Sequence, residues 1–337
     1  MRCRITGGNV TDRQFIRRED LTDFVRAAFG SSRRLIDVDR LTGGTKKGVY
    51  RLTLDDGATS VLYAWNDDEN YWPATSGSPA DPFADASGAD LLVAAHARLT
   101  AAGVRVPEML MFDGSRTHYP ADLALLEDVR GGTLQSLIER SPEAAEAPLR
   151  HLGEALVAMQ RHQSPHIGKV AHVESGLAPQ DRRPEQVALD AALRHLGIVA
   201  GRVELLGRAA GRIEERVREL ADAVHPRDVY GLIHGELGAD HVMLDDDGAP
   251  VMIDIEGVMF FDVEWEHAFT RMRLGPEYAR LQIDLDLDPA RLEFYDLAQS
   301  LSLVEGPLRI ADGDFPDREW MLWLAGVHTE KVLRLTS

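Results

Sequence analysis

The sequence predicts an α+β protein in which a small part rich in antiparallel strands precedes a larger, mostly helical part. Between residues 35 and 65, short apolar segments are separated by turns that contain glycine, which is the pattern of paired antiparallel strands. From Pro148 onward, apolar residues recur at three- and four-residue spacing over long segments, which is the pattern of helices. Two further short strands, residues 242–244 and 251–253, flank an acidic turn at residues 245–248.

Length and composition are those of an ordinary globular protein. The 337 residues are enough for two lobes and a sizeable core. Apolar residues make up 44% and charged residues 27% of the chain, which are usual fractions for a soluble protein. The net charge of −18 argues against a nucleic-acid partner, because its phosphates would be repelled. This charge suits a cationic small substrate in an acidic cleft, although a solvated acidic surface explains most of it more simply.

The sequence also indicates the cellular compartment. Cys3 is the single cysteine, so an internal disulfide and a cysteine-based zinc site are excluded. The N-terminal residues lack the apolar segment of a signal peptide, and no apolar run reaches the length of a membrane span. We therefore expect a cytoplasmic protein that has no membrane partner.

The regular segments of the N-terminal part alternate with turns. They are predicted as a helix at residues 18–29, a strand–turn–strand unit at 35–54, a strand at 60–65, a helix at 89–102, and strands at 104–112 and 121–127. The turn of the strand–turn–strand unit contains Gly43, Gly44, Lys46 and Lys47. Paired glycines let backbone N–H groups approach phosphate oxygens, and the lysines add positive charge there. Such a turn is common between strands, and the chain lacks the G-x-x-x-x-G-K-[ST] phosphate loop.

Residues 66–86 are acidic and rich in Pro, Gly and Ser, so we expect a long loop. Tyr71 and Trp72 lie in this loop after three acidic residues. These aromatic side chains either form a flap that receives a cationic or sugar-like group, or pin a surface loop to the lobe.

The C-terminal part is predicted to be mainly helical. Its helices are expected at residues 149–162, at 185–223 with a break near Gly201 or Gly207, at 288–303 and at 314–335. Pro307, Gly313 and Pro316 mark the loop expected between the last two helices.

The candidate site is built around the acidic hairpin. An apolar run ends in His234, and a polar loop with Glu236 and His241 follows it. The hairpin then delivers Asp254 and Glu256. Because a hairpin returns the chain, Glu236 and Asp254 can converge although they lie 18 residues apart (254 − 236). Clustered carboxylates beside a neutral imidazole suit a divalent cation and a proton acceptor.

The segments His234-Gly235-Glu236-Leu237 and Ile253-Asp254-Ile255-Glu256, with His241 between them, resemble the catalytic segment of the aminoglycoside phosphotransferase/choline kinase family. The pattern of that family is roughly H-G-D-x-x-x-x-N followed by I-D-x-x. Weaker similarity extends from about Leu41 to the C-terminal helices. The resemblance implies a two-lobed protein-kinase-like fold, with a nucleotide-binding lobe at residues 1–128 and a mostly helical substrate lobe at residues 129–337.

The resemblance also implies roles for the residues of the catalytic segment. Asp254 matches the metal-binding Asp and would hold Mg²⁺. Glu236 stands where the family has its catalytic Asp, and it would orient or deprotonate an acceptor hydroxyl. His241 stands where the family has a metal-binding Asn, as a secondary ligand or as a residue that orients Glu236. His234 completes the catalytic set, where a hydrogen-bonding role in the loop is favoured over proton transfer.

Two residues that the family uses for the nucleotide phosphates are missing. The position of the family's strand lysine is nearest to Tyr63, which carries no charge. The glutamate that pairs with this lysine is also missing, because no Glu occurs in residues 81–106. We expect either that Lys46 or Lys47 supplies the phosphate-binding charge from the turn, or that nucleotide binding is impaired.

The resemblance extends to the hinge between the lobes and to the segment after the hairpin. It implies that Glu127 and Val129 border the adenine of the nucleotide. Asp262 is expected to be the N-cap of a helix. Three residues that follow are expected to face solvent: Glu264, Glu266 and His267.

The leading functional hypothesis is ATP-dependent phosphorylation of a small-molecule hydroxyl, on an aminoglycoside-like compound, an amino alcohol or another metabolite, by a monomer or homodimer. The alternative is a catalytically impaired kinase-like protein that acts as a binding or regulatory module. A third hypothesis keeps the nucleotide and changes the acceptor, for example to a peptide side chain.

Overall fold

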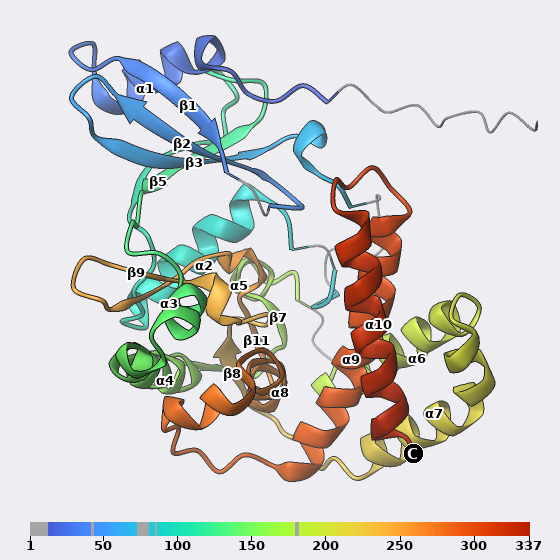
Figure 1. Cartoon of the computed structure of the whole chain (residues 1–337). Helices are drawn as coiled ribbons and strands as arrows, with labels where there is room; N and C mark the ends of the chain where they lie inside the picture. Colours follow the sequence, from blue (N-terminus) through green and yellow to red (C-terminus); the bar gives the residue numbers. More distant parts are fainter. Residues whose placement is uncertain (1–12, 42–43, 73–80, 85, 179–181) are drawn as a thin grey trace, which may run out of the picture.

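The computed structural model describes residues 13–41, 44–72, 81–84, 86–178 and 182–337. An antiparallel sheet forms the N-terminal lobe, drawn at the top of Figure 1, and most helices lie in the larger lobe below it. The predicted α+β, two-lobed architecture is therefore confirmed. No helix in these ranges has the length and apolar character needed to cross a membrane.

The N-terminal sheet has five antiparallel strands. In spatial order they are β1 (Leu35–Arg40), β2 (Gly48–Leu54), β3 (Thr59–Trp65), β5 (Asp122–Glu127) and β4 (Met109–Asp113). Alternate residues of β2 are buried, which is what the period of two predicts for a strand with one face on the core. The expected strand–turn–strand unit and the strand after it are confirmed.

Helices cover both faces of this sheet. The first helix, α1 (Thr22–Phe29), follows the short turn Arg18–Leu21, and its Phe24 packs into a core with residues of β2 such as Leu52. On the other face, α2 (Ala89–Ala101) packs its apolar residues, among them Leu92, against β3 and β5. The core on the α2 side continues into the C-terminal lobe. One apolar core contains residues from both sides of the predicted boundary between residues 128 and 129. The boundary stays a prediction.

The C-terminal lobe packs helices around short strands. Its helices are α3 (Leu134–Arg140), α4 (Glu146–Gln160), α5 (Val170–Glu174), α6 (Pro184–Ala200), α7 (Glu204–Asp222), α8 (Val263–Leu274), α9 (Pro289–Ala311) and α10 (Arg318–Leu335). A four-stranded sheet has the order β6 (Gln163–Ser164), β8 (Tyr230–Ile233), β11 (Met259–Phe261) and β7 (Gly168–Lys169). Short 3-10 turns complete the description at Asp67–Glu69, Pro142–Ala145, Ala239–His241, Ile255–Gly257 and Gly275–Leu281.

Two helix predictions had different outcomes. The expected break near Gly201 is confirmed, because α6 ends at Ala200 and α7 begins at Glu204. The loop expected at Pro307 is wrong, because Pro307 lies inside α9. The helix continues past this proline since the residues after it, such as Ile310, are buried against α10. Tertiary burial outweighs the local cost of a proline here.

Candidate active site

The acidic hairpin forms as predicted. Strand β9 (Val242–Leu244) pairs antiparallel with β10 (Pro250–Met252), with Val251 opposite Met243. In the turn, the Asp245 carboxylate accepts hydrogen bonds from two backbone amides. Gly248 has φ = +78°, a left-handed conformation that glycine adopts without a steric cost. The hairpin returns the chain to the loop that precedes β9.

His241 joins this loop to Asp254. Its Nδ1 lies 2.9 Å from the backbone carbonyl of Glu236 and its Nε2 lies 3.7 Å from Oδ2 of Asp254. A carbonyl oxygen can only accept, so Nδ1 donates, and Nε2 of a neutral imidazole is left as an acceptor that faces the carboxylate. The predicted proximity of His241 and Asp254 is confirmed.

The side chains of Glu236 and His234 differ in accessibility. Glu236 is exposed, which leaves its carboxylate accessible to an acceptor molecule. His234 is buried, and its Nε2 donates to the backbone carbonyl of Ile253, 3.0 Å away. This bond ties the loop to the residue before Asp254, which is a positioning contact. The catalytic assignments of Glu236 and His234 stay predictions.

Asp254 occupies a backbone conformation that is unusual for a residue other than glycine. Its φ of 59° and ψ of 47° lie in the left-handed region, where Asp and Asn are tolerated better than other side chains. Its side chain is 47% exposed, and Oδ1 accepts a hydrogen bond of 2.6 Å from Nζ of Lys47. The Lys47 ammonium holds the pKa of Asp254 well below its usual range.

Lys47 bridges two carboxylates. Its Nζ is 2.6 Å from Asp254 and 2.6 Å from Oε1 of Glu256, and it lies 4.7 Å from the ring centroid of Tyr63. Burial opposes protonation of Lys47, but Asp254 and Glu256 outweigh it and raise its pKa. Glu256 is buried, and burial raises its pKa against the lowering effect of Lys47. We name Lys47, Asp254 and Glu256 the cleft cluster.

Lys46, the neighbour of Lys47 in the glycine turn, contacts an aromatic ring. Nζ of Lys46 is 4.9 Å from the ring centroid of Trp72, so the two lysines have different surroundings. A Cβ on Gly44 would lie 2.7 Å from the Lys47 carbonyl, which explains the glycine at this position. Gly43 lies outside the described residues. The phosphate-binding role of these residues stays a prediction.

The aromatic residues of the loop after β3 pin the glycine turn to the C-terminal helices. Nε1 of Trp72 donates to Thr45 (3.0 Å), and the Trp72 ring lies against Gly306 of α9. Tyr71 is buried and packs edge-on against Phe315. These contacts support the pinning interpretation for this part of the loop rather than a flap open to a substrate.

The predicted hinge joins the two lobes after β5. The carboxylate of Glu127 pairs with Arg105 (2.6 Å) and accepts from the backbone N–H of Glu108, so this side chain stabilises the strand edge. Val129 is buried. A Cβ on Gly131 would lie 2.3 Å from the Leu244 carbonyl, so glycine lets the hinge approach the hairpin. Contacts of Glu127 and Val129 with a nucleotide stay a prediction.

The expectation that Glu264, Glu266 and His267 face solvent is wrong, since all three are fully buried in α8. The carboxylate of Glu266 accepts hydrogen bonds from the backbone N–H groups of His234, Gly235 (2.9 Å) and Leu237. Glu266 therefore fixes the backbone of the candidate catalytic loop. The sequence did not indicate this role. A buried carboxylate whose partners are backbone groups far along the chain leaves no local sequence pattern.

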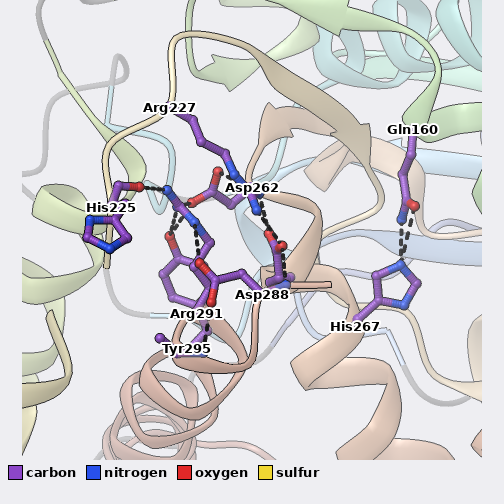
Figure 2. Close-up of polar contacts among 10 residues, drawn as sticks. Gln160, His225, Arg227, Asp262, His267, Asp288, Arg291 and Tyr295 are labelled. Atoms are coloured by element: carbon purple, nitrogen blue, oxygen red, sulfur yellow. Dashed lines mark hydrogen bonds and ion pairs between the residues drawn. The ribbon is translucent and has the colours of Figure 1, made fainter. Parts of the chain in front are cut away.

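A second ionic group consists of Arg227, Asp262, Glu264 and Arg291, and we name it the buried cluster. Figure 2 shows Arg227, Asp262 and Arg291 of this cluster. Arg291 is completely buried and bonds Asp262, which also accepts a hydrogen bond from Tyr295. Arg227 makes two bonds to Glu264, at 2.7 and 2.8 Å. Burial raises the pKa of Asp262 to about 6, against the lowering effect of Arg291. Asp262 stands at the N-cap position of α8, but its side chain does not cap the helix, so that prediction is only half right.

The residues around Asp254 fit a magnesium ion that is held partly by phosphates rather than by a protein cage. No group of three or more His, Cys, Asp and Glu side chains is placed to hold a metal within the described ranges. Mg²⁺ in phosphoryl-transfer sites binds one or two carboxylates and completes its shell with phosphate and water. Asp254, half exposed and with Oδ2 3.7 Å from Nε2 of His241, fits such a ligand. His241 is the weaker candidate, because magnesium prefers oxygen.

A two-lobed fold with a cleft cluster next to a hairpin-supported polar loop defines a kinase-like protein. The model of the phosphotransferase enzyme family matches residues 52–295, so the chain belongs to this family. None of the curated proteins compared with the chain matches it.

Solved structures share the fold at low sequence identity. The apo form of a thermostable mutant of aminoglycoside phosphotransferase APH(4)-Ia has a TM-score of 0.61 and 18% identity, over 92% of this chain and 98% of its own. A ternary complex of a thermostable mutant of the same enzyme with ADP and hygromycin B has a TM-score of 0.59 and 16% identity, over 92% and 98%. The GDP and kanamycin complex of APH(2")-IIia has a TM-score of 0.62 and 15% identity, over 93% and 98%. Likeness at this identity establishes the fold.

Proposed function

We propose that this protein transfers a phosphoryl group from a nucleoside triphosphate to a hydroxyl of a small molecule. The observation that carries the proposal is the cleft cluster, in which a lysine and a half-exposed carboxylate meet beside the loop that bears the exposed Glu236. Phosphoryl transfer needs mainly positioning and compensation of the phosphate charge, and these groups supply both. Family membership agrees with this chemistry.

The proposed roles follow from the surroundings of each residue. Asp254 would hold a magnesium ion, which neutralises charge on the phosphates when bound. Glu236 would accept a hydrogen bond from the acceptor hydroxyl and take its proton, since its carboxylate is accessible. Glu266 and His234 keep the loop in place through hydrogen bonds to its backbone and to Ile253. A cationic acceptor, such as an amino sugar or amino alcohol, suits the net charge of −18.

The nucleotide arm of the test is thermal unfolding with ATP or GTP, each with and without magnesium. Binding to the folded state raises the melting temperature by mass action, and we expect this rise to need magnesium. Turnover is then measured against amino sugars, amino alcohols and nucleosides, with Glu236→Gln as the variant expected to lose about 100-fold or more in kcat. Absence of any stabilisation by either nucleotide with any metal would refute the proposal.

A second candidate is a kinase-like protein that binds a ligand without transferring phosphate. It is favoured by Tyr63, an uncharged residue at the strand position of the family lysine, and by the lack of a glutamate in α2. Nucleotide stabilisation without consumption of nucleotide in the presence of any acceptor of the panel would favour this candidate. Nucleotide consumption with a peptide but with no small molecule would instead indicate a different acceptor.

A further inference from the structure

The cleft contains a lysine–glutamate pair that comes from unexpected elements. The family resemblance implies a lysine on β3 and a glutamate on α2. Here β3 has Tyr63, and the acidic residue of α2 is Asp90, which is exposed. Lys47 and Glu256 form the pair instead, from the residue before β2 and from the turn Ile255–Gly257.

Lys47 reaches the strand position of the missing lysine from the neighbouring strand. Val49 pairs with Tyr63 across the ladder between β2 and β3, so Lys47 starts two residues from the partner of Tyr63. Its side chain is only 9% exposed, and its ammonium lies over the Tyr63 ring, 4.7 Å from the centroid. An aromatic ring at this position attracts a cation, whereas a second lysine would repel it.

Glu256 takes the position of a helix glutamate without belonging to the helix. The turn that carries it packs directly against α2. Nζ of Lys47 lies 2.6 Å from Oε1 of Glu256, which is buried, and no other cationic side chain of the described residues forms an ion pair with this carboxylate. A buried carboxylate needs a cation to compensate its charge. Lys47 is placed to be that cation.

We propose that Lys47 is the phosphate-binding lysine of this protein and that Glu256 is the positioning residue that holds it. The inference rests on the proposed function. A lysine is a point charge on a flexible stem, so the place of its ammonium matters more than the strand from which it comes. Because Lys47 belongs to the glycine turn, phosphate binding is coupled to the position of this turn, which Thr45 and Trp72 tie to α9.

The test is a double-mutant cycle on the dissociation constants of Mg-ATP and Mg-GTP, measured by titration calorimetry on full-length protein. We expect Lys47→Met to weaken binding by about tenfold or more and Glu256→Gln by about fivefold. The double variant should bind within about twofold of Lys47→Met, because Glu256 acts only through the lysine. Lys46→Met, which removes the same charge one residue away, should have a much smaller effect.

A relocation variant separates this role from a purely structural one. Lys47→Met/Tyr63→Lys returns the lysine to β3, and we expect it to recover most of the affinity that Lys47→Met loses. Additive effects in the cycle, or binding by Lys47→Met within about twofold of the wild type, would overturn the inference. If Lys47→Met loses its circular dichroism spectrum, Lys47→Gln replaces it in the cycle. A wild-type protein that binds no nucleotide refutes the proposed function, whereas binding that ignores Lys47 refutes only this inference.

Discussion

The cleft cluster and the buried cluster are built from the same kinds of side chain but differ in access to solvent. In the cleft cluster, the Asp254 side chain is 47% exposed and the lysine bridges two carboxylates. In the buried cluster, Arg291 and Asp262 are sealed from solvent, and Tyr295 adds a further hydrogen bond. Because Arg291 and Asp262 have fixed partners and no exposed surface, we expect them to support structure. A half-exposed carboxylate can exchange a lysine for a ligand.

Among the variants that test the difference between the two clusters, removal of Arg291 is expected to have the largest effect. Arg291→Met leaves Asp262 buried without its closest cation, and we expect a loss of about 3–5 kcal/mol in the free energy of unfolding. Urea denaturation followed by circular dichroism measures the loss. Arg208→Met removes an exposed ion pair with Glu204 and should leave stability nearly unchanged. A loss below about 1 kcal/mol for Arg291→Met would mean that the buried cluster does not stabilise the fold.

The pH dependence of stability gives the next largest effect. The pKa of Asp262 is raised from 3.8 to about 6 on folding, so the folded protein binds more protons than the unfolded chain between these values. The contribution of Asp262 to stability therefore falls as pH rises from about 4 to 6, by about 3 kcal/mol. The difference in unfolding free energy between wild type and Asp262→Asn should show this fall. A difference that is constant or rises over the same range contradicts the raised pKa.

Glu266 links the two clusters, because it lies in α8 and holds the loop beside the cleft. Glu266→Gln removes the charge from hydrogen bonds to Gly235 and its neighbours, and we expect a loss of about 2 kcal/mol in unfolding free energy. The kcat should fall by more than the loss of folded protein accounts for, because the loop carries Glu236. Glu319→Gln, at an exposed position of α10, is the matched control. Wild-type turnover in Glu266→Gln would show that loop position does not limit the reaction.

The smallest effect on stability is expected in the cleft. Asp254→Asn should change the unfolding free energy by less than about 1 kcal/mol, because the carboxylate is half exposed and Asn tolerates the left-handed backbone. The same variant should lose magnesium-dependent nucleotide binding in calorimetry. Asp254→Ala should be less stable than Asp254→Asn by about 1 kcal/mol, because alanine bears the full steric cost of φ = 59°. Equal stability of the two variants would remove the argument from backbone conformation.

Local sequence predicted the parts of the fold whose residues are close in the chain. The hairpin formed at the expected place because Asp245 and Gly248 supply a tight turn between two apolar strands. The prediction failed at Pro307, where a local helix-breaking signal was outweighed by burial of α9 against α10. A proline restricts only the backbone next to it, whereas the packing of α9 depends on residues from the whole lobe.

In the candidate site, too, some features could be predicted from the sequence and others depended on the tertiary structure. The motif around His234 and Asp254, and the absence of a charged residue at Tyr63, were visible in the sequence. The sequence left Lys46 and Lys47 as equal candidates, and only their different surroundings separate them. The support by Glu266 was not predictable, because its partners lie about 30 residues away.

The sequence by itself determined which chemical groups are available: one acidic hairpin, one glycine turn with two lysines, and no lysine on β3. The tertiary structure decided which of these groups meet, since Lys47 and Asp254 are 207 residues apart and touch only when the two lobes pack. It also decided which acids are buried in α8. The physical reason is that backbone preference acts over a few neighbouring residues, while ion pairing and burial depend on distances that the folded chain alone sets.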